Sequence, residues 1–149
     1  MEELIEIFNL HAIRYLVIGG QAVRLEGFPR FSMDWDVLLP PHDTNNIARI
    51  NALIEDELDY PLEPLGPRSE NFIQTYQTRW GILQFHLGAP GLSTFDVLES
   101  RAVHRPLSEG IVAKCICGSD LLASKRATHR AADIADIEFL EAKQQAGLL

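Results

Sequence analysis

Two neighbouring sequence features constrain the fold of this chain most. The first is an apolar run that ends in two glycines, and the second is an aspartate pair on the next apolar run. Residues 15–18 form a compact apolar segment that ends at Gly19 and Gly20, which predicts a buried strand and a tight turn. Residues 21–26 favour a helix that opens on these glycines, and residues 35–39 predict a second strand. The fold is therefore expected to begin with a strand, a glycine turn, a helix and another strand.

Two carboxylates near the start of the second strand predict a metal site. Asp34 and Asp36 point to the same side, because alternate residues of a strand share a face. They lie about 7 Å apart along the strand. Like charges this close repel one another unless a cation bridges them. A hard divalent ion that prefers oxygen ligands, Mg²⁺ or Mn²⁺, is the natural bridge.

The glycine turn predicts a phosphate cradle beside that metal site. Gly19 and Gly20 join a strand to a helix, and such a junction exposes backbone N–H groups with no Cβ in the way. No Lys-Ser/Thr pair follows at the Walker spacing, and the G-x-G-x-x-G fingerprint is absent. A phosphate cradle beside paired carboxylates suggests metal-assisted phosphoryl or nucleotidyl transfer.

The rest of the chain mixes helices with strands, which favours an α+β or α/β fold. The 149 residues show no internal repeat, so residues 1–149 are expected to form one domain. Periodicity and turn residues predict helices at 2–11, 44–58, 119–129 and 132–145, strands at 79–87, 94–98 and 111–116, and a loop at 60–70.

The distribution of charge narrows the choice of partners. Thirteen basic and 21 acidic residues give a formal net charge of −8, which argues against broad binding to nucleic acid or anionic lipid. Residues 1–66 hold 12 acidic and 4 basic side chains, so the excess lies in the first half. Residues 101–130 hold 6 basic and 2 acidic side chains, which suits a nucleotide or a single RNA end.

Neither a membrane nor an oxidising compartment is indicated. No apolar run approaches the length of about 20 residues that a membrane helix needs. The N-terminus is acidic where a secretory signal would be basic. Cys115 and Cys117 are too close for an ordinary disulfide, and two thiols alone do not make a structural zinc site. A cytoplasmic protein with reduced thiols is expected.

The motifs together resemble the nucleotidyltransferases of the DNA polymerase beta superfamily, in particular its small, minimal or AbiEii-like members. In that superfamily a GG or GS turn precedes a D-x-D pair on the neighbouring strand. The segment Arg30-x-Ser32-x-Asp34-x-Asp36 is similar to the R-x-T-x-D-x-D of the small members, with Ser in place of Thr. Residues 120–127 and 130–137 look like their D-L-hhh-K-xx-A and R-xx-D-hh-D-h tail. The resemblance spans roughly residues 13–140.

The resemblance implies both a fold and an activity. The implied fold is α+β, nucleotidyltransferase-like, with a small mixed sheet, helices packed on it and a C-terminal helical segment. The implied reaction moves a nucleoside monophosphate from an NTP to an acceptor hydroxyl on an RNA end, a protein or a small molecule. The implied metal ligands are Asp34 and Asp36, holding two Mg²⁺ ions. The implied nucleotide and phosphate ligands are Gly19, Gly20, Arg30, Ser32 and Lys125.

The place of the third carboxylate that active members carry on a later strand stays open. Asp96, between Phe95 and Val97, has the expected apolar neighbours and is the preferred candidate. The segment from Leu83 to Leu87 holds no acid, so His86 or Gln84 would stand there instead. An imidazole takes up a proton but does not replace a hard oxygen ligand for Mg²⁺.

Three functional hypotheses follow. The leading one is an active nucleotidyltransferase in which Asp96, or else His86, draws the acceptor proton. The second is a nucleotidyltransferase-fold module that binds a nucleotide or a partner protein without turnover, as a regulator or as half of a toxin–antitoxin pair. The third and weakest is an antibiotic-modifying enzyme, since the acidic first half would attract a polycationic aminoglycoside.

Overall fold

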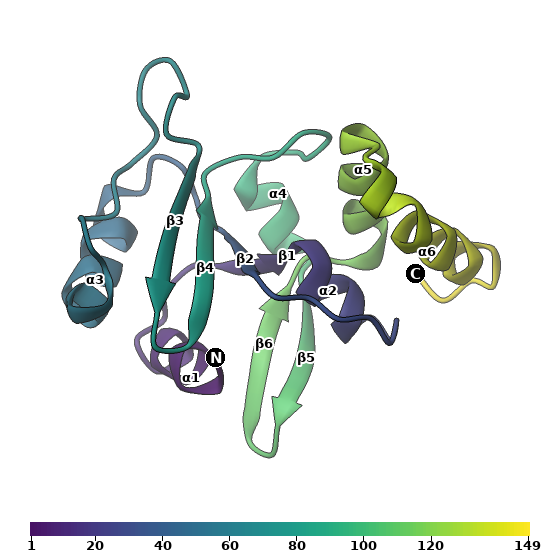
Figure 1. Ribbon diagram of the computed structural model, residues 1–149, viewed down its shortest axis with the longest axis horizontal. Helices are drawn as coiled ribbons and strands as arrows, with labels where there is room; N and C mark the ends of the chain where they lie inside the picture. The colour runs from purple at the N-terminus through teal and green to yellow at the C-terminus, as the bar shows by residue number, and fades with distance from the viewer.

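A six-stranded mixed sheet organises the chain, and the computed structural model describes all of residues 1–149 (Figure 1). The strand order is β3-β4-β2-β1-β6-β5. The β1–β2, β3–β4 and β5–β6 pairs are antiparallel, whereas β2–β4 and β1–β6 are parallel. The strands are β1 (Leu16–Ile18), β2 (Trp35–Leu38), β3 (Ile73–Thr78), β4 (Gly81–His86), β5 (Val103–Ser108) and β6 (Ile111–Cys115).

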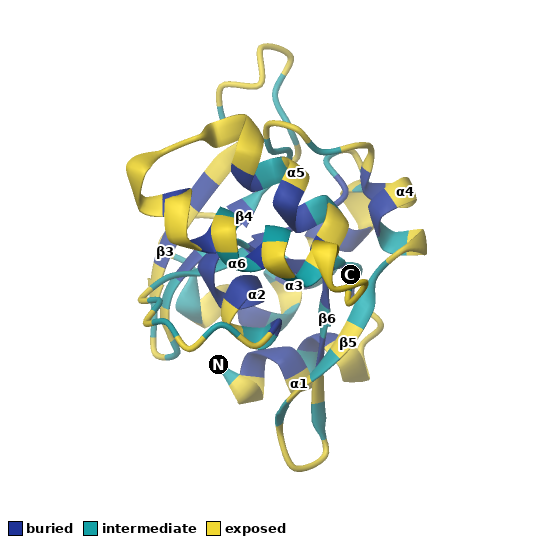
Figure 2. Ribbon diagram, turned by 90° about the vertical axis from the view of Figure 1, so that its right-hand side faces the viewer, coloured by how far each residue is buried: buried dark blue, intermediate teal, exposed yellow.

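Helices cover this sheet, and the last two lie together at one end of the molecule (Figure 1). Figure 2 shows that the outward sides of α5 and α6 are exposed. The α-helices are α1 (Glu2–Leu10), α2 (Gly19–Leu25), α3 (Thr44–Ile54), α4 (Phe95–Ser100), α5 (Gly118–Thr128) and α6 (Ile134–Gln145), and the 3₁₀ turns are η1 (Glu55–Glu57) and η2 (Ala131–Asp133). The mixed α+β fold expected from the sequence is confirmed.

The register of the two central strands brings the glycine turn to the aspartate pair. Every residue of β1 is buried, as its apolar composition predicts, so this strand lies inside the sheet. In the antiparallel β1–β2 pair Ile18 lies opposite Asp36. The chain turns at Gly19 directly after Ile18 and enters α2. The end of β1 and the start of β2 therefore lie side by side, at the same end of the two central strands.

The prediction of a strand at residues 94–98 is wrong, because this segment is part of helix α4. Phe95 and Leu98 are both buried and lie three residues apart, which is the spacing of a helix face. The run is too short for strand and helix to be told apart by residue type alone. The hairpin neighbour of β4 is accordingly β3 and not the segment around Asp96.

Two strands carry no clear signal in the sequence. In β3, Gln74 and Tyr76 are the buried residues, so a polar side chain stands where alternation would call for an apolar one. The other, β5, contains Pro106, which lacks a backbone donor and is tolerated here because β5 is an edge strand.

A core of 29 buried apolar residues fills the space between the sheet and the helices. Leu4, Ile5 and Phe8 contribute the buried side of α1, while Leu121 and Leu122 contribute that of α5. Both cysteines are free thiols. None of the helices combines the length and the apolarity that crossing a bilayer requires.

Candidate active site

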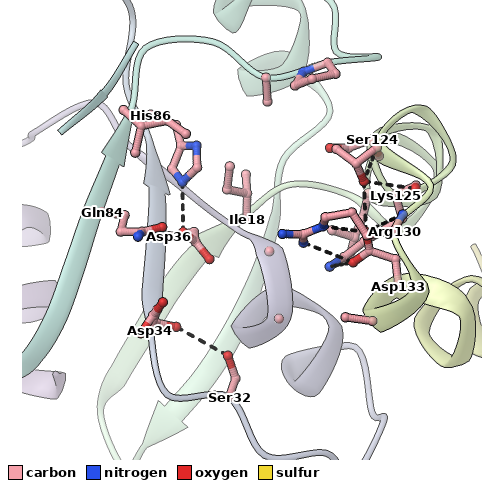
Figure 3. Close-up of a pocket in the computed structure, with 18 of the residues that line it drawn as sticks. Ile18, Ser32, Asp34, Asp36, Gln84, His86, Ser124, Lys125, Arg130 and Asp133 are labelled. Atoms are coloured by element: carbon pink, nitrogen blue, oxygen red, sulfur yellow. Dashed lines mark hydrogen bonds and ion pairs between the residues drawn. The ribbon is translucent and has the colours of Figure 1, made fainter. Parts of the chain in front are cut away.

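One cavity of about 560 Å³ lies where the glycine turn, the aspartate pair and α5 approach one another. Figure 3 shows Asp34, Asp36 and His86 on one side of it, and Lys125, Arg130 and Asp133 on the other. Its lining includes the sequence-predicted residues Gly19, Gly20, Arg30, Ser32, Asp34, Asp36, His86 and Lys125, and it does not include Asp96.

The glycine turn lies directly against the first functional side chains. Gly19 has a φ of +68°, and a Cβ placed on it would lie 2.5 Å from Asp36 Oδ2. A Cβ on Gly20 would lie 2.7 Å from Ser32 Oγ and 3.4 Å from Arg30 Cζ. Only glycine allows the backbone to come this close, so the two glycines bring their peptide groups to the carboxylate and to the Arg30 guanidinium.

The two aspartates flank the start of β2, a strand hydrogen-bonded on both sides. Asp34 directly precedes β2 and Asp36 is its second residue. Across the parallel β2–β4 pair Asp36 lies opposite Gln84. His86 Nε2 lies 2.8 Å from Asp36 Oδ1, within hydrogen-bonding distance. One Asp36 oxygen therefore contacts an imidazole, while the other faces the glycine turn.

Asp96, the preferred third carboxylate, is not brought to this pair. Its side chain is 81% exposed and accepts a hydrogen bond from Arg14 Nη2 at 2.6 Å. Arg14 precedes β1, whereas Asp36 lies opposite the last residue of β1, Ile18. Leu16, the first residue of β1, lies opposite Leu38 at the far end of β2 from Asp36. The Arg14–Asp96 pair therefore lies beyond the opposite end of β1 from the cavity.

The other candidate place for the third carboxylate, around Gln84 and His86, is the one that lies beside the two aspartates. Gln84 and His86 lie on β4, the strand beside β2, and both line the cavity. No group of three or more His, Cys, Asp or Glu side chains is arranged to hold a metal ion. An amide and an imidazole thus stand where the resemblance implies a third carboxylate.

A network of ion pairs around two buried aspartates forms the opposite wall. Lys125, 6% exposed, donates to Asp133 Oδ1 at 2.9 Å and lies 3.1 Å from Asp136 Oδ2. Arg130 Nε lies 3.0 Å from Asp133 Oδ2, and Arg30 pairs with Asp136. Both aspartate side chains are only 1% exposed. The network fixes three cationic groups at the cavity and ties the Arg30 segment to α6.

Comparison with known proteins identifies the fold. No protein-family model matches the chain, and no curated protein matches its sequence. The crystal structure of the lincosamide antibiotic adenylyltransferase LnuA, with lincomycin bound, matches 93% of this chain and 92% of its own at a TM-score of 0.60 and 17% identity. An antigenic nucleotidyltransferase-like protein from Paracoccidioides brasiliensis matches 93% of this chain and 72% of its own at a TM-score of 0.56 and 16% identity.

The chain has a nucleotidyltransferase fold. At 16–17% identity the comparison establishes the fold alone, so the chemistry has to be argued from the cavity.

The donor set of this nucleotidyltransferase fold suits one hard divalent ion. Mg²⁺ in phosphoryl-transfer sites is held by one or two carboxylates together with substrate phosphates. Asp34 and the Asp36 oxygen that faces Gly19 supply such ligands, because His86 contacts only Asp36 Oδ1. Gln84, opposite Asp36, adds a neutral amide oxygen. The residues present therefore fit one ion shared with a phosphate.

Sequence reasoning missed the apolar part of the cavity wall of this nucleotidyltransferase fold. Phe72 directly precedes β3, a strand that was not predicted, and Ile73 is its first residue, while Ala89 and Pro90 follow β4. Asp133 also lines the cavity. Its ion pairs with Lys125 and Arg130 form part of the wall.

Replacing Gly19 with Ala should weaken both the fold and the site. The positive φ costs a Cβ-bearing residue about 1–2 kcal/mol of unfolding free energy. The new Cβ would also displace the Asp36 carboxylate, so the affinity for Mg-ATP should fall.

Gly110, with a φ of +78° and nothing within 4 Å of an added Cβ, is the matched control. Gly110→Ala should lose similar stability in urea unfolding and keep its affinity in calorimetry; equal affinities for the two variants would contradict the close approach.

The free energy of unfolding should fall as the pH drops below about 4. Burial raises the pKa of Asp133, but hydrogen bonds from Arg130, Lys125 and Thr128 outweigh it and hold that pKa well below its usual value. The folded chain then keeps the carboxylate charged where the unfolded chain takes up a proton, so stability present above the unfolded pKa is lost on acidification. Urea unfolding at about pH 5 and about pH 3 should show a smaller loss for Asp133→Asn than for the parent. Equal losses would mean that Asp133 does not carry the effect.

Proposed function

We propose that this chain transfers a nucleoside monophosphate from a Mg-NTP to an acceptor hydroxyl. One observation carries the proposal: a glycine turn, an aspartate pair and a cationic wall line the same cavity. The turn allows backbone groups to approach a phosphate closely, the carboxylates suit a hard divalent ion, and the cations suit the negative charge of a triphosphate. The fold of the two similar structures agrees with this reaction class. We also propose that residues 1–149 act as a single nucleotidyltransferase-like domain.

Each wall of the cavity has its own role in this proposal. Asp34 and Asp36 hold the ion, which when bound neutralises charge on the phosphates. Gly19 and Gly20 face the β- and γ-phosphates. Asp36 and Arg130 line the same cavity from opposite sides, so one ligand can contact both walls. A triphosphate placed between them contacts both.

His86 takes the role that the sequence pattern gave first to Asp96. The acceptor oxygen bonds to the α-phosphorus, the bond from that phosphorus to the pyrophosphate oxygen breaks, and His86 receives the hydroxyl proton. The hydrogen bond between His86 Nε2 and Asp36 Oδ1 at 2.8 Å orients the imidazole beside the carboxylates. Removing a positioned general base lowers turnover by about a hundredfold to ten-thousandfold.

The direct test follows a labelled nucleotide onto an acceptor. The full chain is incubated with Mg²⁺, each of four α-labelled NTPs, and tRNA, candidate partner proteins or hydroxyl-bearing small molecules, including lincosamide and aminoglycoside antibiotics. Transfer to any acceptor that is lost in His86→Asn, while Mg-ATP binding is kept, supports the proposal. No transfer to any acceptor, together with no binding of a Mg-NTP by calorimetry, sinks it.

A second candidate function rests on the amide opposite Asp36. Because Gln84 is neutral, the site has one hard charged ligand fewer than the resemblance implies. A nucleotide-binding module without turnover, such as one half of a toxin–antitoxin pair, fits that deficit. It predicts Mg-ATP binding with no transfer to any acceptor, and a biological activity that Asp34→Asn leaves almost unchanged. A large loss of that activity in Asp34→Asn would remove this candidate.

A further inference from the structure

An apolar shelf lies in the cavity beside His86. The shelf consists of Phe72, Ile73, Ala89 and Pro90, all of which line the cavity. Ile73 lies opposite His86 in the β3–β4 pair, and directly opposite residues of a pair project to the same face. The backbone N–H of Leu87 donates to Phe72 O at 2.7 Å, which holds Phe72 next to the end of β4. The shelf therefore adjoins the group to which we assign the acceptor proton.

Exposed apolar side chains gather at this cavity. Ten large apolar side chains are exposed in the whole chain, and four of them, Phe31, Met33, Phe72 and Ile73, line it. Phe72 is 42% exposed and Ile73 40%. Clustered exposed apolar residues at a concave site are typical of ligand contact, whereas isolated ones need no explanation.

The cationic groups of the cavity are all paired with carboxylates, so once a triphosphate and its ion are bound they leave little free charge for a polyanionic acceptor. Arg30, Lys125 and Arg130 are its basic lining residues, and each is already paired with Asp133 or Asp136. Of the six basic residues between positions 101 and 130, only Lys114 forms no ion pair. The positive excess read from the sequence is thus neutralised within the fold, and no charged residue belongs to the shelf.

We propose that the shelf binds the acceptor, and that the acceptor is a small hydroxyl compound bearing an uncharged apolar ring or chain. This inference rests on the proposed function, because it assigns a substrate class to the same site. An apolar acceptor gains by leaving water for Phe72 and Ile73, while its hydroxyl faces His86. The cavity volume of about 560 Å³ lies in the range of small-molecule sites, about 300–1,000 Å³. The end of a nucleic acid, by contrast, would need unpaired cations along its backbone.

Nuclear magnetic resonance of the full chain tests the shelf directly. The probes are 2-phenylethanol and an RNA trinucleotide with a free 3′-hydroxyl, each added with and without Mg²⁺ and an ATP analogue that has a methylene between the α- and β-phosphorus. We expect 2-phenylethanol to shift the methyl signals of Ile73 and Ala89 in a saturable way, and the trinucleotide to leave them in place.

Two substitutions make the assignment specific. Ile73→Gln should weaken 2-phenylethanol binding about tenfold, because it replaces the apolar contact with an amide. Val112 is the matched control, since it is 39% exposed on strand β6 and does not line the cavity. Val112→Gln should leave the binding unchanged, and both variants should bind the ATP analogue as the parent does.

Several results would overturn the shelf assignment. They are the absence of saturable 2-phenylethanol shifts, shifts by the trinucleotide at Ile73 and Ala89, and weaker binding of the ATP analogue in Ile73→Gln. The last would mean that the shelf holds the nucleobase. A failure of the proposed function is separate, because it appears as no binding of the ATP analogue by the unsubstituted chain.

Discussion

Asp36→Asn is expected to lower the affinity for Mg-ATP by about a hundredfold. The substitution removes one charge of the aspartate pair and changes the oxygen that faces Gly19, so the ion loses a hard anionic ligand. Affinity for ATP in the absence of a divalent ion should change little. Isothermal titration calorimetry with and without Mg²⁺ separates the two contributions.

Asp96→Asn supplies the matched control for this prediction. The chemical change is the same, but the Asp96 side chain is 81% exposed and pairs with Arg14 away from the cavity. Arg14 also keeps its contacts with Asp43 and Glu99, so the fold should hold. Mg-ATP affinity equal to that of the parent is expected. Losses of Mg-ATP affinity of similar size in the two variants would mean that Asp96 contributes to the nucleotide site. They would refute the assignment of the cavity as that site.

Asp136→Ala is expected to cost about 3–5 kcal/mol of the free energy of unfolding. Asp136, 1% exposed, faces both Lys125 and Arg30, and its removal leaves buried positive charge without its carboxylate. The Arg30 segment also loses its tie to α6. Urea unfolding followed by circular dichroism measures the loss as a lower midpoint with an unchanged slope.

A surface pair in the same region gives the comparison. Glu141 pairs with Arg126 at 2.8 Å, with side chains 39% and 50% exposed. Glu141→Ala should cost no more than about 1 kcal/mol, because water screens the exposed charges and replaces the lost contact. If Asp136→Ala cost as little unfolding free energy as Glu141→Ala, the ion pairs of Asp136 would contribute no more than an exposed pair. The description of Asp136 as a buried support of the cavity wall would then be wrong.

The centre of the site could be predicted because its signals are local. The glycine turn, the aspartate pair and Arg30 lie within eighteen residues from Gly19 to Asp36, and each depends on strand alternation or on the absence of a Cβ. Strand β2 and helix α2 follow from the same short stretch. These elements are found where the sequence analysis expects them, with helix α2 beginning at Gly19 itself.

The residue in the place of the third carboxylate could not be predicted, because it depends on which strand lies beside β2. Both Asp96 and the Leu83–Leu87 run offered apolar flanks in sequence. The choice was made by the burial of Phe95 and Leu98 on one face of α4, which turns the Asp96 segment into a helix. Strand pairing is a property of the whole sheet, so neither run carries that information by itself.

The apolar shelf and the full ion-pair network were also beyond the sequence. The shelf depends on β3, whose buried residues include Gln74, a polar side chain that obscures the alternation. The charge count between residues 101 and 130 indicated a basic face. That face is absent because its basic residues pair with carboxylates such as Glu26 and Glu141, which lie outside residues 101–130.

The central place of β2 in the sheet has a consequence for the motions of the cavity. Asp36 lies on a strand whose backbone is hydrogen-bonded to a neighbour on each side, so its amide can exchange with solvent deuterium only when the sheet opens. The opposing wall includes the short 3₁₀ turn η2, which joins α5 to α6. Amide exchange should therefore be slowest on the β2 side of the cavity and faster at η2. Changes in the width of the cavity would then come from movement of the helical wall, while the carboxylates stay fixed.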